Sequence, residues 1–407
     1  MVAGNALEFY DFGTYSFFAL QIGRTFFPSQ DPFSSLLLSF ATFGAGFLTR
    51  PIGAIVMGRV ADRRGRTPAM MVTFLLMGFS VAGMAMTPSY HLIGVAAPIL
   101  LVAWRLLQGF AVGGELGPTT AFLTEVAPPR QRGFFGSLQT GSTNISILAA
   151  GVVGFALSKI LSAQLLGDWG WRCAFLVGTA VVPVGLFVRR YLPETLHASE
   201  TVAAGATHAQ RSYVVLGALG LGMIVSGTVL TYLRIYLTTY AVNTMHFDSR
   251  VAFATTMVNG LCGIFSYLLG GWISDRVGRK PVMVSSTFLL ALMALPIMKA
   301  IVQIHTPGAL YSGTAVVTLL MGIGQGPVLT TISELLPPRI RAGVLGTLYA
   351  VGVGVFGGTT QFVVAWLIGK TGNSLVPGWY MTAAAILGVA CMLGIRETAP
   401  CRTRTAA

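Results

Sequence analysis

The sequence predicts an all-α membrane protein whose twelve transmembrane helices form two six-helix bundles. Three observations predict this class. Charged residues make up 10% of the chain, against about 25% in an average soluble domain, and the mean hydropathy is +0.73. Long apolar stretches are separated by short loops. One loop sequence occurs twice, half a protein apart, so the chain has the form of a duplicated membrane bundle.

The apolar stretches have the length that a bilayer requires, because a spanning helix needs about 20 mostly apolar residues. The predicted spans are 5–27, 33–57, 69–87, 95–123, 133–160, 169–190, 212–240, 250–273, 281–303, 309–335, 343–369 and 377–395. The longest polar gap separates the sixth span from the seventh. We therefore expect bundles at 1–192 and 212–397, a cytoplasmic linker at 193–211 and a cytoplasmic tail at 398–407.

The basic residues indicate how the chain is oriented. The formal net charge is +13, and most loop arginines fall on the side of the two repeated loops. By the positive-inside rule, this side is cytoplasmic. The pattern predicts an integral membrane protein with both termini in the cytoplasm, and the membrane that we expect is a bacterial inner membrane. Membrane topology explains the positive charge, so we expect the lipid bilayer and not nucleic acid as a partner.

The repeated loop follows the pattern GxxxDRxGR, with Asp62 in the first copy and Asp275 in the second. A second repeat leads from Gly-Pro to Glu125 in one half and to Glu334 in the other. A carboxylate beside arginine at the membrane face can bond to a neighbouring helix end in one conformation and release it in another. The gating residues that we expect are Asp62, Arg63, Arg66, Asp275, Arg276, Arg279, Glu125, Arg132, Glu334 and Arg341.

These loops, together with the RLLQG sequence at 105–109, resemble the major facilitator superfamily. The runs at 4–12, 50–54 and 108–115 resemble its metabolite:proton symporter branch, which carries citrate, 2-oxoglutarate, shikimate, proline and betaine. Those at 43–48, 168–172 and 355–358 look closest to the citrate and tricarballylate carriers. The resemblance covers essentially the whole chain. It implies a proton-coupled symporter that imports a small organic di- or tricarboxylate by alternating access.

Charged residues inside the spans need a functional or structural reason, since each costs at least about 2.5–3.5 kcal/mol at mid-depth. Asp11, Arg50 and Glu115 are expected at similar depth in the first half. A buried carboxylate can carry a proton, and an arginine that approaches or leaves can switch it. The five histidines fall in loops. Asp11 and Glu115 are therefore the first candidates for proton coupling and Glu8 the third, although the cluster could instead only hold helices together.

Arginines indicate the charge of the substrate. Arg234 interrupts the seventh span between Tyr232 and Tyr236, and no acidic residue in that span neutralises it. Such an arginine can hold a carboxylate with two hydrogen bonds. Arg105 serves either this purpose or a structural one. The full set of expected substrate-binding residues is Arg234, Arg105, Arg50, Tyr10, Tyr232, Tyr236, Gln139, Asn144, Asn259, Gln325 and Gln361, of which the amides could equally join helices.

Several alternatives remain open. A carrier of a zwitterion such as proline or betaine would need less positive charge, and a drug or metabolite exporter would need a more apolar cavity. No nucleophile–base pair, metal cluster or nucleotide loop appears, so we expect neither an enzyme nor a cofactor or metal. A channel is disfavoured because duplicated gating loops suit alternating access. The expected partners are a small organic anion and a proton, and the expected state is a monomer.

Overall fold

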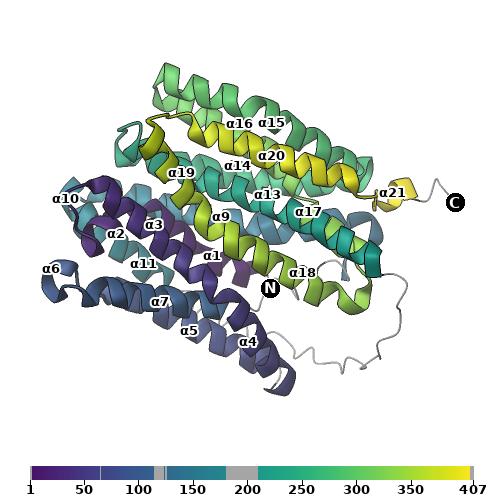
Figure 1. The fold of residues 1–407 in the computed structure, drawn as a ribbon, viewed down its shortest axis with the longest axis horizontal. Helices are drawn as coiled ribbons and strands as arrows, with labels where there is room; N and C mark the ends of the chain where they lie inside the picture. The colour runs from purple at the N-terminus through teal and green to yellow at the C-terminus, as the bar shows by residue number, and fades with distance from the viewer. Residues whose placement is uncertain (1, 65, 114–122, 124–125, 180–209, 404–407) are drawn as a thin grey trace.

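The computed structural model describes residues 2–64, 66–113, 123, 126–179 and 210–403, which are helical without strands. Figure 1 shows the helices of the first half of the chain gathered on one side of the molecule and those of the second half on the other. Short helices α6 and α10 lie at one end of the molecule, here called the far end. Helix α21 lies at the opposite end, here called the tail end.

The first half follows the predicted spans. Its elements are α1 (Val2–Phe17), α2 (Ala19–Phe26), α3 (Pro32–Leu48), α4 (Arg50–Arg64), α5 (Arg66–Met86), α6 (Tyr90–Ile93), α7 (Ala96–Val112), η1 (Pro129–Gln131), α9 (Arg132–Ile160), α10 (Ala163–Leu165), η2 (Leu166–Gly170) and α11 (Trp171–Gly178). The pairs α1–α2 and α3–α4 each fill one predicted span.

The second half also follows the predicted spans, and its helices are longer. Its elements are α13 (Gln210–Asn243), α14 (Ser249–Val277), α15 (Arg279–Ile304), α16 (Pro307–Gln325), α17 (Val328–Leu335), α18 (Pro338–Gly352), η3 (Val353–Gly357), α19 (Gly358–Thr371), α20 (Val376–Gly394) and α21 (Pro400–Thr403). The described residues contain eight helical stretches long and apolar enough to cross a bilayer. Two shorter apolar helices, Met71–Met86 and Ala96–Val112, accompany them.

Proline explains two of the interruptions within spans. Helix α3 stops before Arg50-Pro51, and α16 stops before Gly326-Pro327. A proline has no N–H to donate, and its ring clashes with the carbonyl four residues back, so the regular helix breaks there. Side chains cap the starts of α3, α14 and α16 at the far end. In α3, Asp31 accepts hydrogen bonds from Phe33 N and Ser34 N. The described parts of the predicted spans are thus helical, and two of the interruptions fall at prolines.

The two halves meet along α9 and α14, which run in opposite directions and contact each other over their whole length; this contact is here called the seam. Its tail end joins Gly133 to Gly271, and its far end joins Gly154 to Phe253. A side chain on Gly133 or Gly271 would collide with the facing helix. Small residues let helix backbones approach closely in a membrane. The seam therefore depends on glycine at both of its ends.

Candidate functional site

A cavity of about 120 Å³ lies between the two halves. Its lining comes from α1 and α9 on one side and from α13, α14, α16, α17, α18 and η3 on the other. The lining residues are Phe9, Phe12, Gly13, Gln139, Thr140, Thr143, Ile147, Ile224, Gly227, Thr228, Thr231, Tyr232, Ile235, Tyr267, Gln325, Val328, Leu329, Tyr349 and Val353. Within the described chain this lining is apolar, aromatic and neutral polar. It includes the expected Gln139, Gln325 and Tyr232, while Thr228, Thr231, Tyr267 and Tyr349 are lining residues that the sequence did not single out.

Beside this cavity, two buried arginines surround the ring of Phe12. The Arg50 guanidinium lies 4.7 Å from the ring centroid, and that of Arg105 lies 4.9 Å from it. Arg50 also stacks on Phe47 at 4.0 Å. A cation over an aromatic face is stabilised by the ring's quadrupole. The aromatic residues therefore supply part of the compensation that buried arginines need.

Asp11 is one residue before Phe12 and is 1% exposed. Neither carboxylate oxygen has a hydrogen-bond partner within the part of the chain that the structure describes. Arg105 and Arg50 lie within electrostatic reach of this carboxylate. A buried carboxylate without a hydrogen-bond donor is costly when charged, so Asp11 has the surroundings expected of a group that gains and loses a proton.

Close helix packing positions Arg105 on α7. A side chain on Gly109 would collide with the Gly46 carbonyl of α3, so glycine permits this crossing. The Arg105 Nη1 donates to Gln108 Oε1, and its Nη2 donates to the Phe43 carbonyl at 3.4 Å. Its Nε has no partner among the described residues. Arg105 thus combines a fixed position with spare donor capacity.

Arg234 lies on α13 and is 1% exposed. Its Nη1 donates to Asn144 Oδ1 at 2.9 Å, which joins α13 of the second half to α9 of the first. Asn259 of α14 donates through Nδ2 to the Arg234 carbonyl at 3.2 Å and accepts from Thr318 at 3.3 Å. The structure therefore brings three of the expected substrate-binding residues together. None of the three lines the cavity.

Three further expected binding residues lie away from the cavity lining. The Tyr10 hydroxyl donates to the Ala174 carbonyl at 3.2 Å. Tyr236 packs against Phe40 and Tyr240. Gln361 is fully buried on α19, and neither polar atom of its amide has a hydrogen-bond partner in the described chain.

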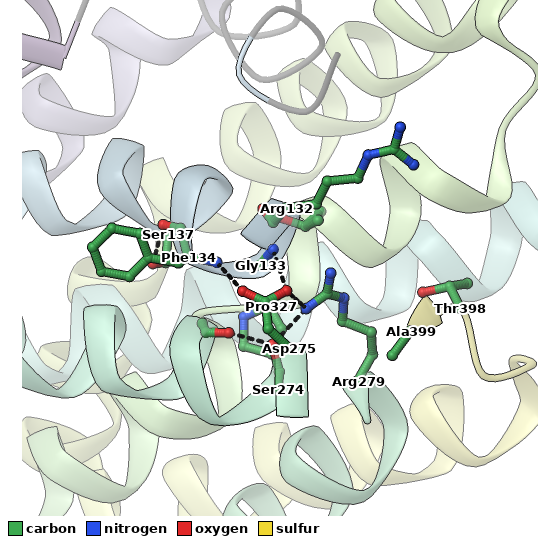
Figure 2. Close-up of polar contacts among 12 residues, drawn as sticks. Arg132, Gly133, Phe134, Ser137, Ser274, Asp275, Arg279, Pro327, Thr398 and Ala399 are labelled. Atoms are coloured by element: carbon green, nitrogen blue, oxygen red, sulfur yellow. Dashed lines mark hydrogen bonds and ion pairs between the residues drawn. The ribbon is translucent and has the colours of Figure 1, made fainter. Parts of the chain in front are cut away.

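Asp275 ties the two halves together at the tail end of the seam (Figure 2). Its Oδ1 accepts a hydrogen bond from Gly133 N and its Oδ2 one from Phe134 N, each at 2.9 Å. Helix α9 has no capping side chain of its own, and its first N–H groups need acceptors. A carboxylate from the other half supplies them, as its charge favours at a helix N-terminus. The expected contact with a neighbouring helix end is present here.

Arg279 links Asp275 to the second repeated motif. Its Nη1 lies 2.6 Å from Asp275 Oδ1, and its Nη2 lies 3.3 Å from Glu334 Oε1. Ser274 accepts a further hydrogen bond from Nη1 at 2.8 Å. Arg279 is fully buried. This three-residue ion network, Asp275–Arg279–Glu334, is here called the gate cluster, after the gating role that the sequence predicts for its residues.

The segment before α21 is fastened to the gate cluster, which the sequence did not predict. Glu397 accepts hydrogen bonds from Arg279 N at 2.8 Å and from Lys280 N at 3.1 Å, and so caps α15. The Thr398 hydroxyl donates to Glu334 Oε2 at 2.6 Å. No repeat or periodicity in the sequence connects this segment to the gate cluster, because the contacts arise only from folding.

The other expected gating residues have different surroundings. Arg276 is exposed and stacks on Trp272 at 3.4 Å. The Arg132 side chain points away from the gate cluster in Figure 2, and Arg341 Nη2 donates to the Leu336 carbonyl at 3.3 Å. Glu115 and Glu125 lie outside the described residues, as do the side chains of Glu8, Asp62, Arg63 and Arg66.

A larger pocket of about 1080 Å³ opens at the far end. Both halves contribute to it, and its charged lining residues are Arg24, Arg172, Arg250, Asp168 and Asp248, with His91 beside them. Arg172 donates to the carbonyls of Ala85 and Thr87 at 2.6 and 2.7 Å. Arginine exceeds carboxylate in this pocket.

The structure has two helical halves with a cavity between them, and ionised side chains join the two halves at the tail end. These features are those of a membrane carrier with a repeat-built fold. Residues 1–355 match the Major Facilitator Superfamily. The chain belongs to this family.

Individual relatives and solved structures agree with this assignment. The chain is similar to the citrate-proton symporter of Salmonella typhi, at 34% identity over 97% of this chain and 93% of the relative. It is 35% identical to that of Klebsiella pneumoniae, over 96% and 89%, and 31% identical to the proline/betaine transporter of Escherichia coli strain K12, over 97% and 82%. The fold is similar to a D-xylose-proton symporter, with a TM-score of 0.77, 17% identity and coverage of 98% and 96%.

Proposed function

We propose that the protein is a proton-coupled symporter that imports a small di- or tricarboxylate such as citrate across the bacterial inner membrane by alternating access. The excess of buried positive charge carries this proposal. Arg50, Arg105 and Arg234 are each at most 4% exposed, and Asp11 is the one buried carboxylate near them among the described residues. An anionic substrate would compensate this excess. The relatives named citrate-proton symporters support the same substrate class.

The cavity fits a site that both halves share. A typical ligand pocket has about 300–1,000 Å³, whereas this cavity has about 120 Å³. The halves must therefore separate before a tricarboxylate enters. With the tail end facing the cytoplasm, the gate cluster closes the inner side, and the arginines of the far-end pocket meet an incoming anion first.

In this proposal Asp11 carries the coupled proton, with Glu115 and Glu8 as the further candidates. A neutral Asp11 leaves Arg50 and Arg105 without a nearby negative charge, so a substrate carboxylate is then attracted more strongly. Release of the proton restores the attraction between Asp11 and the arginines and favours release of the substrate. Proton and substrate are thus bound together because they act on the same two guanidinium groups.

A carrier of a zwitterion such as proline or betaine is the second candidate. Five aromatic residues, Phe9, Phe12, Tyr232, Tyr267 and Tyr349, line the cavity. Aromatic faces bind quaternary ammonium groups well, and a proline/betaine transporter is among the relatives. A zwitterion would bring both charges and would not compensate the excess of arginine.

Thermal-shift measurements on the purified protein decide between the two, because a ligand stabilises the folded state by mass action. The panel is citrate, tricarballylate, 2-oxoglutarate, proline and betaine. We expect stabilisation by the carboxylates, and stabilisation by proline or betaine alone would refute the proposal. Replacing Arg234 with Lys keeps the charge but not the planar fork, so carboxylate affinity should fall by about 1.5–3 kcal/mol. Unchanged carboxylate binding in Arg234→Gln would show that this arginine does not hold the substrate.

A further inference from the structure

The contact between Arg234 and Asn144 joins the two halves near the middle of the seam. The guanidinium is buried, yet both acceptors of its Nη1 are neutral: Asn144 Oδ1 at 2.9 Å and, more distantly, the Asn259 carbonyl at 3.5 Å. Its Nε has no hydrogen-bond partner among the described residues. A buried arginine is ordinarily paired with a carboxylate. The chain has therefore placed a weak partner where a strong one would fit.

The amide oxygen is held in position for this contact. Asn144 Nδ2 donates to the Thr140 carbonyl at 2.8 Å, which turns Oδ1 towards Arg234. Gly263 of α14 leaves the space that both groups occupy, because a side chain there would collide with Asn144 Oδ1 and press on Arg234 Nη1. Three helices thus shape the contact, and it is not a chance encounter of two polar side chains.

The contact lies immediately behind the cavity. Thr140 and Thr143 on α9 and Thr231 and Ile235 on α13 line that cavity. They are near neighbours in sequence of Asn144 and Arg234, on the same two helices. To reach a substrate in the cavity, the Arg234 side chain would have to rotate towards these lining residues.

We propose that Asn144 is a place-holder for a substrate carboxylate: it holds Arg234 in the empty carrier and yields it when a carboxylate enters the cavity. A hydrogen bond between arginine and a neutral acceptor is roughly half as strong as one to a carboxylate. An amide can therefore be displaced, whereas an aspartate at this position would hold the guanidinium permanently. This inference rests on the proposed function, because it requires an anionic substrate.

Two substitutions at one position test the place-holder, because they act in opposite directions. Asn144→Asp should raise the unfolding temperature of the empty protein and weaken citrate binding at least tenfold. The sequence placed Asn144 among the expected substrate-binding residues, whereas a place-holder competes with the substrate. Asn144→Ala should therefore lower the unfolding temperature and leave citrate binding as tight as in the wild type or tighter. A purely structural contact would instead weaken binding in both variants. Ser146→Asp adds a carboxylate two residues further along α9 and should lower the unfolding temperature, which controls for buried charge.

The outcomes separate a failure of the proposed function from a failure of the place-holder. A wild type that citrate, tricarballylate and 2-oxoglutarate all fail to stabilise overturns the proposed function and this inference with it. A wild type that binds citrate while Asn144→Asp binds it equally tightly overturns the place-holder alone. If Asn144→Asp does not fold, Asn144→Ala decides, since loss of citrate binding in that variant contradicts the inference and retained binding supports it.

Discussion

Replacing Asp275 with Asn should loosen the tail end of the seam. The aspartate accepts two backbone hydrogen bonds from α9 and pairs with Arg279. Asparagine has one acceptor oxygen, and its NH₂ group cannot accept from Phe134 N or Gly133 N. The variant therefore loses at least one charge-assisted hydrogen bond between the halves.

The size of the effect follows from this loss. A hydrogen bond to a charged group contributes about 1.5–3 kcal/mol, and a factor of ten in an equilibrium costs about 1.4 kcal/mol. We expect the equilibrium between the closed and open tail end to shift towards the open form by roughly ten- to a hundredfold. Substrate affinity should change much less than turnover, because Asp275 and its partners on α9 do not line the cavity; the nearest lining residues on α9 and α14, Gln139 and Tyr267, are about one and a half to two helical turns away.

Reaction of a buried cysteine with a water-soluble maleimide measures this opening. Ser137 is fully buried and faces Gly271 near the tail end of the seam, so Ser137→Cys, in a chain whose four natural cysteines are replaced, reports when the halves separate. The labelling rate should rise by about the same factor in Asp275→Asn. The control is Asp248→Asn, since Asp248 caps α14 at its other end and accepts from Arg250 N.

An unchanged labelling rate in Asp275→Asn would refute the gating role of the contact. An equal rise in Asp248→Asn would show that the rate reports general destabilisation instead of opening at the tail end.

The remaining predictions concern the proton, the first repeated loop and the segment before α21. Asp11→Asn and Glu115→Gln should each abolish accumulation driven by a pH gradient while leaving some exchange; full pH-driven uptake in both would exclude them as the coupling groups. Asp62→Asn should slow turnover more than it weakens binding, and lost binding with normal conformational exchange would contradict this. Thr398→Val should speed labelling at Ser137→Cys less than Asp275→Asn does, because it removes one hydrogen bond to Glu334; an unchanged rate would separate this segment from the gate cluster.

Much of the fold could be predicted from the sequence, because a bilayer imposes length and hydropathy on each span. Proline at residues 51 and 327 even indicates where helices break. The partners of the polar residues could not be predicted in the same way. Asp275 binds backbone groups of α9 more than a hundred positions away in the chain, and a backbone N–H leaves no mark in the sequence.

In the candidate site, too, single residues could be predicted from the sequence and their partners could not. The sequence indicated that Arg234 lacks an acidic neighbour in its own helix, and no described carboxylate approaches it in the fold. The sequence placed Asn144, Asn259 and Arg234 in one expected binding set, but it did not indicate that Asn144 would accept from the Arg234 guanidinium or that Asn259 would bind the Arg234 carbonyl. Glu397 and Thr398 were missed because they resemble any polar tail after a last helix.

The glycines of the seam have a consequence for the speed of the conformational cycle. Where side chains interlock, two helices must pull them out of their grooves before they can tilt, and this disrupts packing on both surfaces. Between Gly133 and Gly271 the helices touch backbone to backbone, so little interlocking has to be undone. The tail end can then be held by a few polar contacts that break one after another. The activation barrier for opening then comes mainly from these polar contacts and only to a small extent from side-chain packing between the two helices.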